Sequence, residues 1–231
     1  VANGHQDVDK PLTRHDALGI EPLEKAMPAE TPHPEASVEH YSLNAAEFVR
    51  SYRSVSPEDV YSEVLDLFPK SPTTVLEVAA GSGRDAAWLA ADGHSVTAVE
   101  PAAGMREAGK EFCEGLDVTW IDSALPALRG VQRPDGGYGF VLAAAVWMHL
   151  PPAARAEAFS RLAELAAPGA TLIVTLRQGP DAPGRPMHPV DPIAEASLAI
   201  ETGFSAARVV ESGADTLGRA DVRWHYLVLQ R

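Results

Sequence analysis

The chain has 231 residues, of which 45% are apolar, so it is long and apolar enough to bury the core of one large domain. Its net charge of -13 at pH 7 repels the phosphate backbone of nucleic acids, and no run of Lys and Arg offsets this charge. A single cysteine, Cys113, excludes an intrachain disulfide and a zinc site built on Cys-x-x-Cys pairs, and it agrees with a cytoplasmic location.

The first 38 residues differ in composition from the rest of the chain. They contain scattered prolines and charges but few large apolar side chains, which predicts an N-terminal tail or arm over 1–38, with short helical turns at 14–18 and 22–26. A single folded domain is expected over 39–231. The longest apolar run, around 141–146, is far shorter than the roughly 20 residues that span a bilayer, so we expect no membrane contact.

Two helices are predicted at the start of the domain. Tyr41, Phe48 and Tyr52 recur at helical spacing and predict a helix over 41–52. Ser56-Pro57-Glu58-Asp59 has the order of an N-cap followed by a first helical turn, so a second helix is expected to begin there and to end before Pro69.

From residue 73 onward, strand patterns alternate with helical patterns. This alternation predicts an α/β fold with a doubly wound, Rossmann-like sheet. The last two strands are separated by a short connection without a helix, so we expect an antiparallel hairpin there, because parallel strands need a crossover of roughly a dozen residues. Strands are predicted at 73–79, 95–99, 117–121, 138–144, 170–176, 205–211 and 222–230, and helices at 84–92, 102–113, 152–166 and 192–202.

A glycine turn follows the first predicted strand. In open α/β sheets, ligands bind at the carboxyl ends of the strands, and Ala80-Gly81-Ser82-Gly83 lies at such an end. Its glycines permit a tight turn, and the helix that begins near Arg84 offers free N–H groups to a carboxylate or phosphate. The spacing Gly81-x-Gly83-x-x-Ala86 fits a dinucleotide fingerprint, and it also fits the loop of enzymes that use S-adenosylmethionine.

Polar residues also follow the next two predicted strands. Glu100 comes after the second strand, where a carboxylate can accept hydrogen bonds from both hydroxyls of a ribose. Asp122-Ser123 comes after the third strand, where a carboxylate can accept a hydrogen bond from the amine of adenine. Together, these positions indicate a nucleoside site.

These residues resemble the class I S-adenosylmethionine-dependent methyltransferases, and the resemblance extends over about 41–231. The pattern Glu77-x-Ala79-x-Gly81-x-Gly83 is similar to the first motif of that family, Glu100 to its ribose-binding acid, and Met105 to an apolar residue beside the adenine. The resemblance implies a seven-stranded sheet of order 3-2-1-4-5-7-6 with strand 7 antiparallel, preceded by N-terminal helices that cover the cofactor pocket.

The resemblance also implies a cofactor and a reaction. The cofactor would be S-adenosylmethionine, the product S-adenosylhomocysteine, and the reaction methyl transfer by in-line displacement (EC 2.1.1). The segment 144–150 is similar to the one that faces the amino-acid end of the cofactor and the substrate. The implied cofactor-binding residues are Tyr41, Tyr52, Glu77, Ala79, Gly81, Gly83, Arg84, Glu100, Pro101, Met105, Asp122, Ser123, Ala144 and Val146.

Four residues are candidates for contact with the methyl acceptor. His149 follows the fourth strand, and its ordinary pKa suits a general base near neutral pH. Arg177 ends the fifth strand and is expected to bind a carboxylate or phosphate. His188 lies in a proline-rich loop at 178–192 that is expected to line the acceptor site, and Trp147 either shapes that site or packs in the core. No histidine spacing indicates a metal site.

Two alternatives stay open beside the methyltransferase. One is an NAD(P)-dependent oxidoreductase, which the helices ahead of the first strand and the closing hairpin disfavour. The other is a non-catalytic protein that binds a nucleotide-like ligand. The acidic charge and the short insertions favour a small-molecule acceptor over nucleic acid or protein. The acceptor atom (O, N, S or C) and the oligomeric state are left open.

Overall fold

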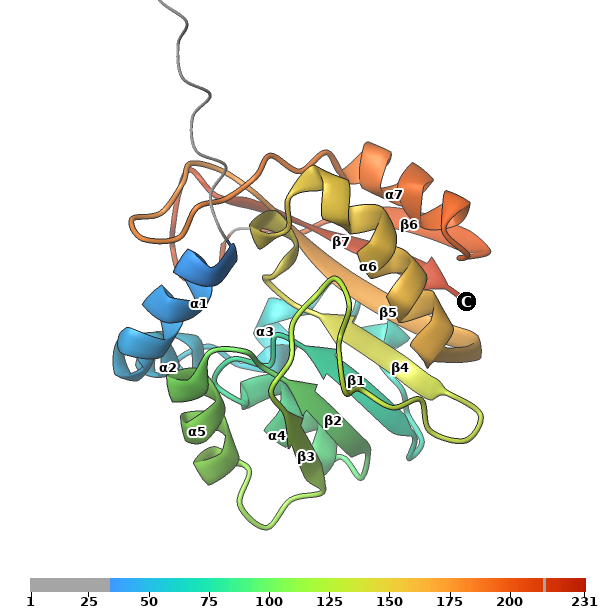
Figure 1. Cartoon of the computed structure of the whole chain (residues 1–231), viewed down its shortest axis with the longest axis horizontal. Coiled ribbons are helices and arrows are strands. Elements are labelled where there is room, and N and C mark those ends of the chain that lie inside the picture. The colour runs from blue at the N-terminus through green and yellow to red at the C-terminus, as the bar shows by residue number, and fades with distance from the viewer. Residues whose placement is uncertain (1–33, 214) are drawn as a thin grey trace, which may run out of the picture. The chain divides into compact units, whose positions relative to one another are not determined.

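A seven-stranded sheet forms the centre of the fold, and its strands lie in the order β3-β2-β1-β4-β5-β7-β6 (Figure 1). The structure is a computed structural model that describes residues 34–213 and 215–231. The order and the antiparallel β7 are confirmed, because β7 pairs antiparallel with both β5 and β6 while the remaining neighbours are parallel. The strands are β1 (Thr74–Val78), β2 (Ser95–Val99), β3 (Val118–Ile121), β4 (Tyr138–Ala143), β5 (Ala166–Gln178), β6 (Ala206–Glu211) and β7 (Arg223–Gln230).

Helices cover both faces of this sheet, and the sheet separates two clusters of buried side chains (Figure 1). Alternate residues of a strand point to opposite faces, so Val141 packs in one cluster and Leu142 in the other. The first cluster includes Phe159 and Leu162, and the second includes Leu89. The helices that follow the strands are α4 (Arg84–Ala91), α5 (Ala103–Phe112), α6 (Pro152–Leu165) and α7 (Pro192–Glu201). Burial on both faces explains the continuous apolar sequence of the central strands.

The N-terminal part of the described chain differs from prediction in two places. The predicted helix over 41–52 is two helices, α1 (Pro34–Leu43) and α2 (Ala45–Tyr52), because the Asn44 side chain donates to the His40 carbonyl at 2.9 Å and ends the first. The helix α1 also begins inside the predicted tail. The rest of that tail, with the helical turns predicted at 14–18 and 22–26, lies outside the described residues.

The helix predicted to begin at Ser56 is correct at its start and wrong in its length. The Ser56 hydroxyl accepts from the Asp59 amide at 3.0 Å, as an N-cap does, but α3 (Pro57–Val60) is followed by turns and by the 3-10 helix η1 (Leu65–Leu67). Tyr61 is fully buried and its hydroxyl donates to Asp85 at 2.6 Å. This tertiary contact replaces the regular helical continuation that the apolar spacing predicted.

Two further elements depart from the predicted pattern. Pro168 and Gly169 were expected to lie ahead of the fifth strand, whereas β5 begins directly after α6 and includes them. The 3-10 helix η2 (Trp147–His149) was not predicted, and it follows β4 at the edge of the sheet where ligands bind in this class of fold. Within the described part of the chain, no helix is both long enough and apolar enough to cross a membrane.

Candidate functional site

A continuous cavity lies at the carboxyl ends of β1, β2, β4 and β5. Helix α1 contributes Ser37 and Tyr41 to its wall, and the connection between β6 and β7 contributes Asp215 and Arg219. The cavity therefore joins the glycine turn after β1 to segments that lie far away in the sequence.

The glycine turn at one end of the cavity adopts a backbone conformation that few residues tolerate. Ala79, Gly81 and Gly83 have φ values of 59°, 52° and 77°, all in the left-handed region. A Cβ on Gly83 would lie 3.0 Å from the Cα of Gly109 on α5, so the turn also needs glycine for close packing. The predicted need for glycine at this turn thus has two physical causes.

Arg53, directly after α2, fixes the outer side of this turn. Its guanidinium donates to the Ser82 carbonyl at 3.1 Å and to the Ala108 carbonyl at 2.9 Å, and it lies 3.9 Å over the ring of Phe112. One side chain therefore connects the N-terminal helices, the glycine turn and α5. The sequence analysis did not identify Arg53, because nothing in its local pattern shows which carbonyls it reaches.

Glu100 lies at the inner side of the turn. One carboxylate oxygen accepts from the Gly81 amide and the other from the Ala102 amide, both at 2.8 Å. Burial raises the pKa of Glu100 to about 7, although these two backbone hydrogen bonds oppose the rise. Each oxygen keeps a second lone pair, so the carboxylate retains the capacity to accept hydrogen bonds from a ligand in the cavity.

Glu77, at the end of β1, is a second buried acid on the cavity wall. Its Oε2 has no hydrogen-bond partner among the described residues. Burial raises its pKa well above the ordinary value, and the nearby Asp85 adds to that rise while Arg84 opposes it. Arg84 forms an ion pair with Asp85 at 2.6 Å. The end of the cavity next to the glycine turn is therefore rich in buried carboxylates.

Asp122 was predicted to lie on the cavity wall, but it does not line the cavity. Its side chain is 68% exposed and forms an ion pair with Arg106 at 2.8 Å. The adjacent residues Ser123 and Leu125 do line the cavity, as does Met105. Side chains after β3 thus contribute to the cavity, while the Asp122 carboxylate turns toward α5.

His149, in η2, lies among side chains of α1 and the loop at 179–191. Its Nδ1 is 3.1 Å from the Pro186 carbonyl, which can only accept, so Nδ1 carries the proton of the neutral ring. Its Nε2 then accepts from the Tyr41 hydroxyl at 3.3 Å. Burial, with Arg185 and Arg177 nearby, lowers the pKa of His149 below 6.5. The imidazole is therefore neutral at pH 7 and able to take a proton.

Arg177 is where the sequence predicted it, at the end of β5 and on the cavity wall. It is only 6% exposed, and its Nη1 donates to the Pro180 carbonyl at 3.0 Å. The same Nη1 lies 3.0 Å from the sulfur of Met187. Burial lowers the pKa of Arg177, and Arg219 and Arg185 add to this effect.

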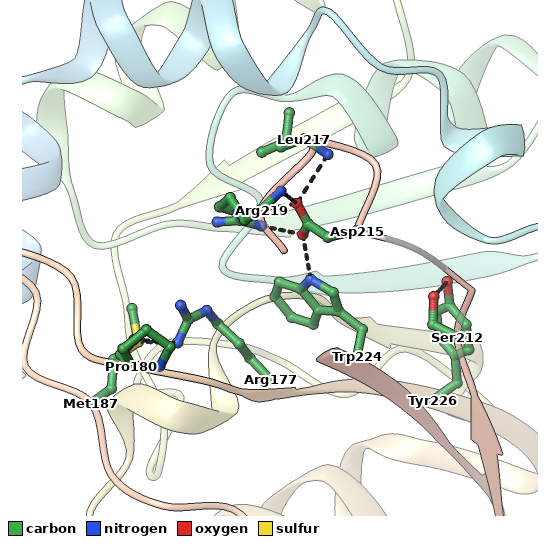
Figure 2. Close-up of polar contacts among 9 residues, drawn as sticks. All are labelled: Arg177, Pro180, Met187, Ser212, Asp215, Leu217, Arg219, Trp224 and Tyr226. Atoms are coloured by element: carbon green, nitrogen blue, oxygen red, sulfur yellow. Dashed lines mark hydrogen bonds and ion pairs between the residues drawn. The ribbon is translucent and has the colours of Figure 1, made fainter. Parts of the chain in front are cut away.

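Asp215 organises the connection between β6 and β7 (Figure 2). Its carboxylate accepts from the amides of Leu217 and Arg219, from the Arg219 guanidinium and from the Trp224 indole at 2.8 Å. Although burial opposes its charge, hydrogen bonds from Arg219 and Trp224 lower the pKa of Asp215 to about 2. This carboxylate holds Arg219 and Trp224 together against the cavity.

Most of the predicted site residues line this one cavity. Four do not: Gly83 and Asp122, and two of the residues predicted to contact the acceptor, Trp147 and His188. Trp147 is fully buried in the core, 4.3 Å from the ring of Phe159, while the His188 amide donates to the Met148 carbonyl. The predicted residues on the wall are Tyr41, Tyr52, Glu77, Ala79, Gly81, Arg84, Glu100, Pro101, Met105, Ser123, Ala144, Val146, His149 and Arg177.

The sequence analysis missed the contribution of α1 and of both loops at the end of the cavity that holds His149 and Arg177, where the acceptor was predicted to bind. Arg185 and Met187 could have been suspected, since the loop at 178–192 was expected near the acceptor. Nothing in the local pattern marked Ser37, Asp215 or Arg219. Among residues 34–213 and 215–231, no group of three His, Cys, Asp or Glu side chains is arranged to bind a metal ion.

Comparison with known proteins finds similarity to methyltransferases over part of the chain. Residues 75–169 match the family model described as a methyltransferase domain. No curated protein matches the chain by sequence.

Three solved structures share the fold at low sequence identity. Phosphoethanolamine N-methyltransferase 2 of Haemonchus contortus, in complex with phosphomonomethylethanolamine and S-adenosylhomocysteine, has a TM-score of 0.67 at 14% identity, over 87% of this chain and 60% of that one. This chain therefore spans less than two thirds of the Haemonchus protein.

Two further structures are bacterial. Magnesium protoporphyrin IX methyltransferase of Synechocystis, with bound S-adenosylhomocysteine, has a TM-score of 0.63 at 19% identity, over 86% of this chain and 100% of that one. The 1,6-didemethyltoxoflavin-N1-methyltransferase of Burkholderia thailandensis has a TM-score of 0.58 at 19% identity, over 89% and 93% of the two chains. The strand order and the match to a methyltransferase domain over residues 75–169 agree with the resemblance to the class I S-adenosylmethionine-dependent methyltransferases.

Proposed function

We propose that the protein transfers a methyl group from S-adenosylmethionine to a small-molecule acceptor that binds in the same cavity. One observation carries this proposal: the cavity connects Gly81 and Glu100 at one end with His149 and Arg177 at the other. The two substrates of a group transfer must meet in one space, and the presence of both sets of residues on the wall of a single cavity supports this.

The residues at the first end fit the chemistry of the proposed methyl donor. Glu100 has spare acceptor capacity for ribose hydroxyls, and Met105, Ser123 and Leu125 offer apolar contact and a hydroxyl for the adenine. Burial raises the pKa values of Glu77 and Glu100, and a ligand that carries positive charge would favour the ionised form of both acids. When bound, S-adenosylmethionine supplies a methyl group activated on a sulfonium sulfur, and its transfer leaves the neutral S-adenosylhomocysteine.

At the other end, His149 is the proposed base. The Pro186 carbonyl fixes the proton on Nδ1 and so leaves the lone pair of Nε2 for the proton of the acceptor, received directly or through the Tyr41 hydroxyl. Helix α1 contributes Ser37 and Tyr41 to the wall at this end. The acceptor atom is left open, since a nucleophile without a proton would need no base.

Ligand binding tests the proposal. Calorimetry is expected to show that S-adenosylhomocysteine binds the protein and that NADH does not. Replacing Glu100 with Ala is expected to weaken S-adenosylhomocysteine binding by about 1.5–3 kcal/mol, because hydrogen bonds to a charged group are lost. Glu164→Ala is the matched control, since Glu164 is 67% exposed and lies outside the cavity.

Two results would contradict the proposal. Folded protein that binds NADH but not S-adenosylhomocysteine would favour the oxidoreductase. Binding without transfer of labelled methyl from S-adenosylmethionine to any member of a broad small-molecule panel would favour a non-catalytic binder. The cytoplasmic location stays a prediction from the sequence.

A further inference from the structure

Three arginines line the acceptor end of the cavity: Arg177 on β5, Arg185 in the loop at 179–191, and Arg219 in the connection between β6 and β7. They come from three separate segments, and Arg219 and Arg185 lie close enough to add to the burial that lowers the pKa of Arg177. In a chain with a net charge of -13, such a concentration of positive charge needs a physical reason.

Arg219 has its own counter-ion. Its Nη2 lies 2.6 Å from Asp215, and its Nε donates to the same carboxylate at 3.0 Å (Figure 2). The pair is bidentate, which is the strongest geometry for an arginine and a carboxylate. The positive charge of Arg219 is therefore compensated within the loop.

Arg177 and Arg185 have no such partner. No carboxylate forms an ion pair with either one in the part of the chain that the structure describes. The side-chain bonds of Arg177 go to the Pro180 carbonyl and the Met187 sulfur, and that of Arg185 goes to the Tyr41 hydroxyl at 3.3 Å. In both arginines the Nε is buried and has no hydrogen-bond partner among the described residues.

The buried guanidinium of Arg177 costs free energy without a counter-ion, and the buried Nε–H groups of both arginines, which have no acceptor among the described residues, add to that cost. Arg185 lies 4.9 Å over the ring of Phe48, but this contact gives its Nε–H no acceptor, and fold stability alone does not explain two arginines without a counter-ion among the described residues on the wall of one cavity. An anionic ligand would remove the cost, because guanidinium N–H groups bind the oxygens of carboxylates and phosphates with matching geometry.

We propose that the methyl acceptor is a small organic anion whose carboxylate or phosphate group is bound by Arg177 and Arg185. This inference rests on the proposed function and specifies the chemical class of its acceptor. Arg219 is paired with Asp215 and orders the connection between β6 and β7, so it is not assigned to the anion. The apolar neighbours Met187 and Trp224 would contact the uncharged part of the acceptor.

The test uses phenyl compounds that differ in charge, two of which, benzoate and benzamide, have nearly the same shape. Protein saturated with S-adenosylhomocysteine is titrated by calorimetry with benzoate, phenyl phosphate and the uncharged benzamide. We expect one or both anions to bind and benzamide to bind at least tenfold more weakly. The tighter of the two anions tells whether the natural group is a carboxylate or a phosphate.

Charge-removing variants locate the anion. Arg177→Gln and Arg185→Gln are each expected to weaken binding of the anion by about tenfold or more, because each removes charge-assisted hydrogen bonds. Arg161→Gln is the matched control, since Arg161 pairs with Glu164 outside the cavity. If Arg177→Gln does not fold, as shown by its melting curve, Arg185→Gln carries the test by itself.

Several outcomes would overturn the inference. These are equal binding of benzamide and the anions, no anion binding, or unchanged anion binding in the arginine variants. Weakened binding of S-adenosylhomocysteine with unchanged anion binding would assign the arginines to the carboxylate of the cofactor instead. If the wild-type protein does not bind S-adenosylhomocysteine at all, the proposed function fails, and the anion titrations of the protein alone still decide whether the two arginines form an anion site.

Discussion

Each oxygen of the Glu100 carboxylate accepts one backbone N–H, from Gly81 in the glycine turn and from Ala102 ahead of α5. This arrangement uses one side chain to fix two backbone segments and still leaves acceptor capacity toward the cavity. It also leaves the charge buried, and burial raises the pKa of Glu100 to about 7. The residue predicted to bind ribose is therefore titratable near neutral pH.

The affinity for S-adenosylhomocysteine is expected to depend on this titration. Ribose hydroxyls donate to the charged carboxylate and favour it, so binding should strengthen as the pH rises from 5.5 and level off above about pH 7. Calorimetry across this pH range measures the change. Glu100→Gln cannot titrate, so its weaker binding should be independent of pH, and an equally steep dependence in this variant would assign the titration to another group.

His149 gives a separate prediction for catalysis. His149→Asn should reduce kcat by about 10²–10⁴-fold, the range of a lost general base, while the affinity for S-adenosylhomocysteine stays unchanged. Because burial lowers the pKa of His149 below 6.5, the ring is neutral across pH 7, and kcat should fall only when the pH drops below that lowered pKa. Steady-state kinetics against pH test both statements. A variant with full kcat would show that the acceptor needs no base.

At the scale of elements, the connection between β6 and β7 has a rigid centre. Donors from Leu217, Arg219 and Trp224 all converge on the Asp215 carboxylate, whose side chain is only 2% exposed. The sequence showed a short turn with glycines, which is typical of a simple hairpin. The carboxylate converts this turn into an ordered wall of the cavity.

Asp215→Asn is expected to loosen this connection without unfolding the sheet. The amides of Leu217 and Arg219 should exchange with solvent faster, because the charged acceptor that protects them is lost. Hydrogen exchange measures this locally, with β5 amides as the internal control. Hydrogen bonds that Asp215 accepts in the folded protein lower its pKa to about 2. The ionised carboxylate therefore stabilises the folded protein above the ordinary pKa of 3.8, and this stabilisation is lost as the pH falls toward 2. Unchanged exchange at both amides would contradict the role assigned to Asp215.

At the scale of the whole molecule, a buried ion pair connects the segments behind the acceptor end. Glu195 on α7 pairs with Arg155 on α6 and accepts from the Trp147 indole at 2.8 Å. Arg155 also donates to the carbonyls of Leu150 and Pro189, next to η2 and in the loop at 179–191. The pair thus holds the segment of His149 and the loop of Arg185 against the same two helices.

Glu195→Gln is expected to lower the free energy of unfolding by about 3–5 kcal/mol, because it leaves the buried charge of Arg155 without a counter-ion. Urea unfolding measures the loss. The control is Glu164→Gln, which removes the charge of Glu164 from its ion pair with Arg161. Glu164 is 67% exposed, so this change should alter the free energy of unfolding by less than about 1 kcal/mol. Similar losses in the two variants would show that the buried pair contributes no more than the exposed one.

The bounds of most strands and helices were predictable because local patterns determine them. The prediction for β2 was correct at both ends, and that for α4 was within one residue, since Gly83 and Gly93 lie at its ends. Errors occurred where distant contacts override the pattern. The Tyr61 hydroxyl reaches Asp85 and the chain turns there, although its apolar spacing predicted a helix.

The sequence by itself determined the alternating α/β pattern, the glycine turn and the polar residues at the strand ends, because each depends on neighbours within a few positions. Only the tertiary structure decided that Trp147 packs in the core, that Asp122 turns to Arg106, and that Arg177 and Arg185 line one cavity. These facts depend on contacts between segments that the chain brings together only on folding. Which arginines keep a counter-ion, and hence the proposed charge of the acceptor, is a property of that three-dimensional arrangement.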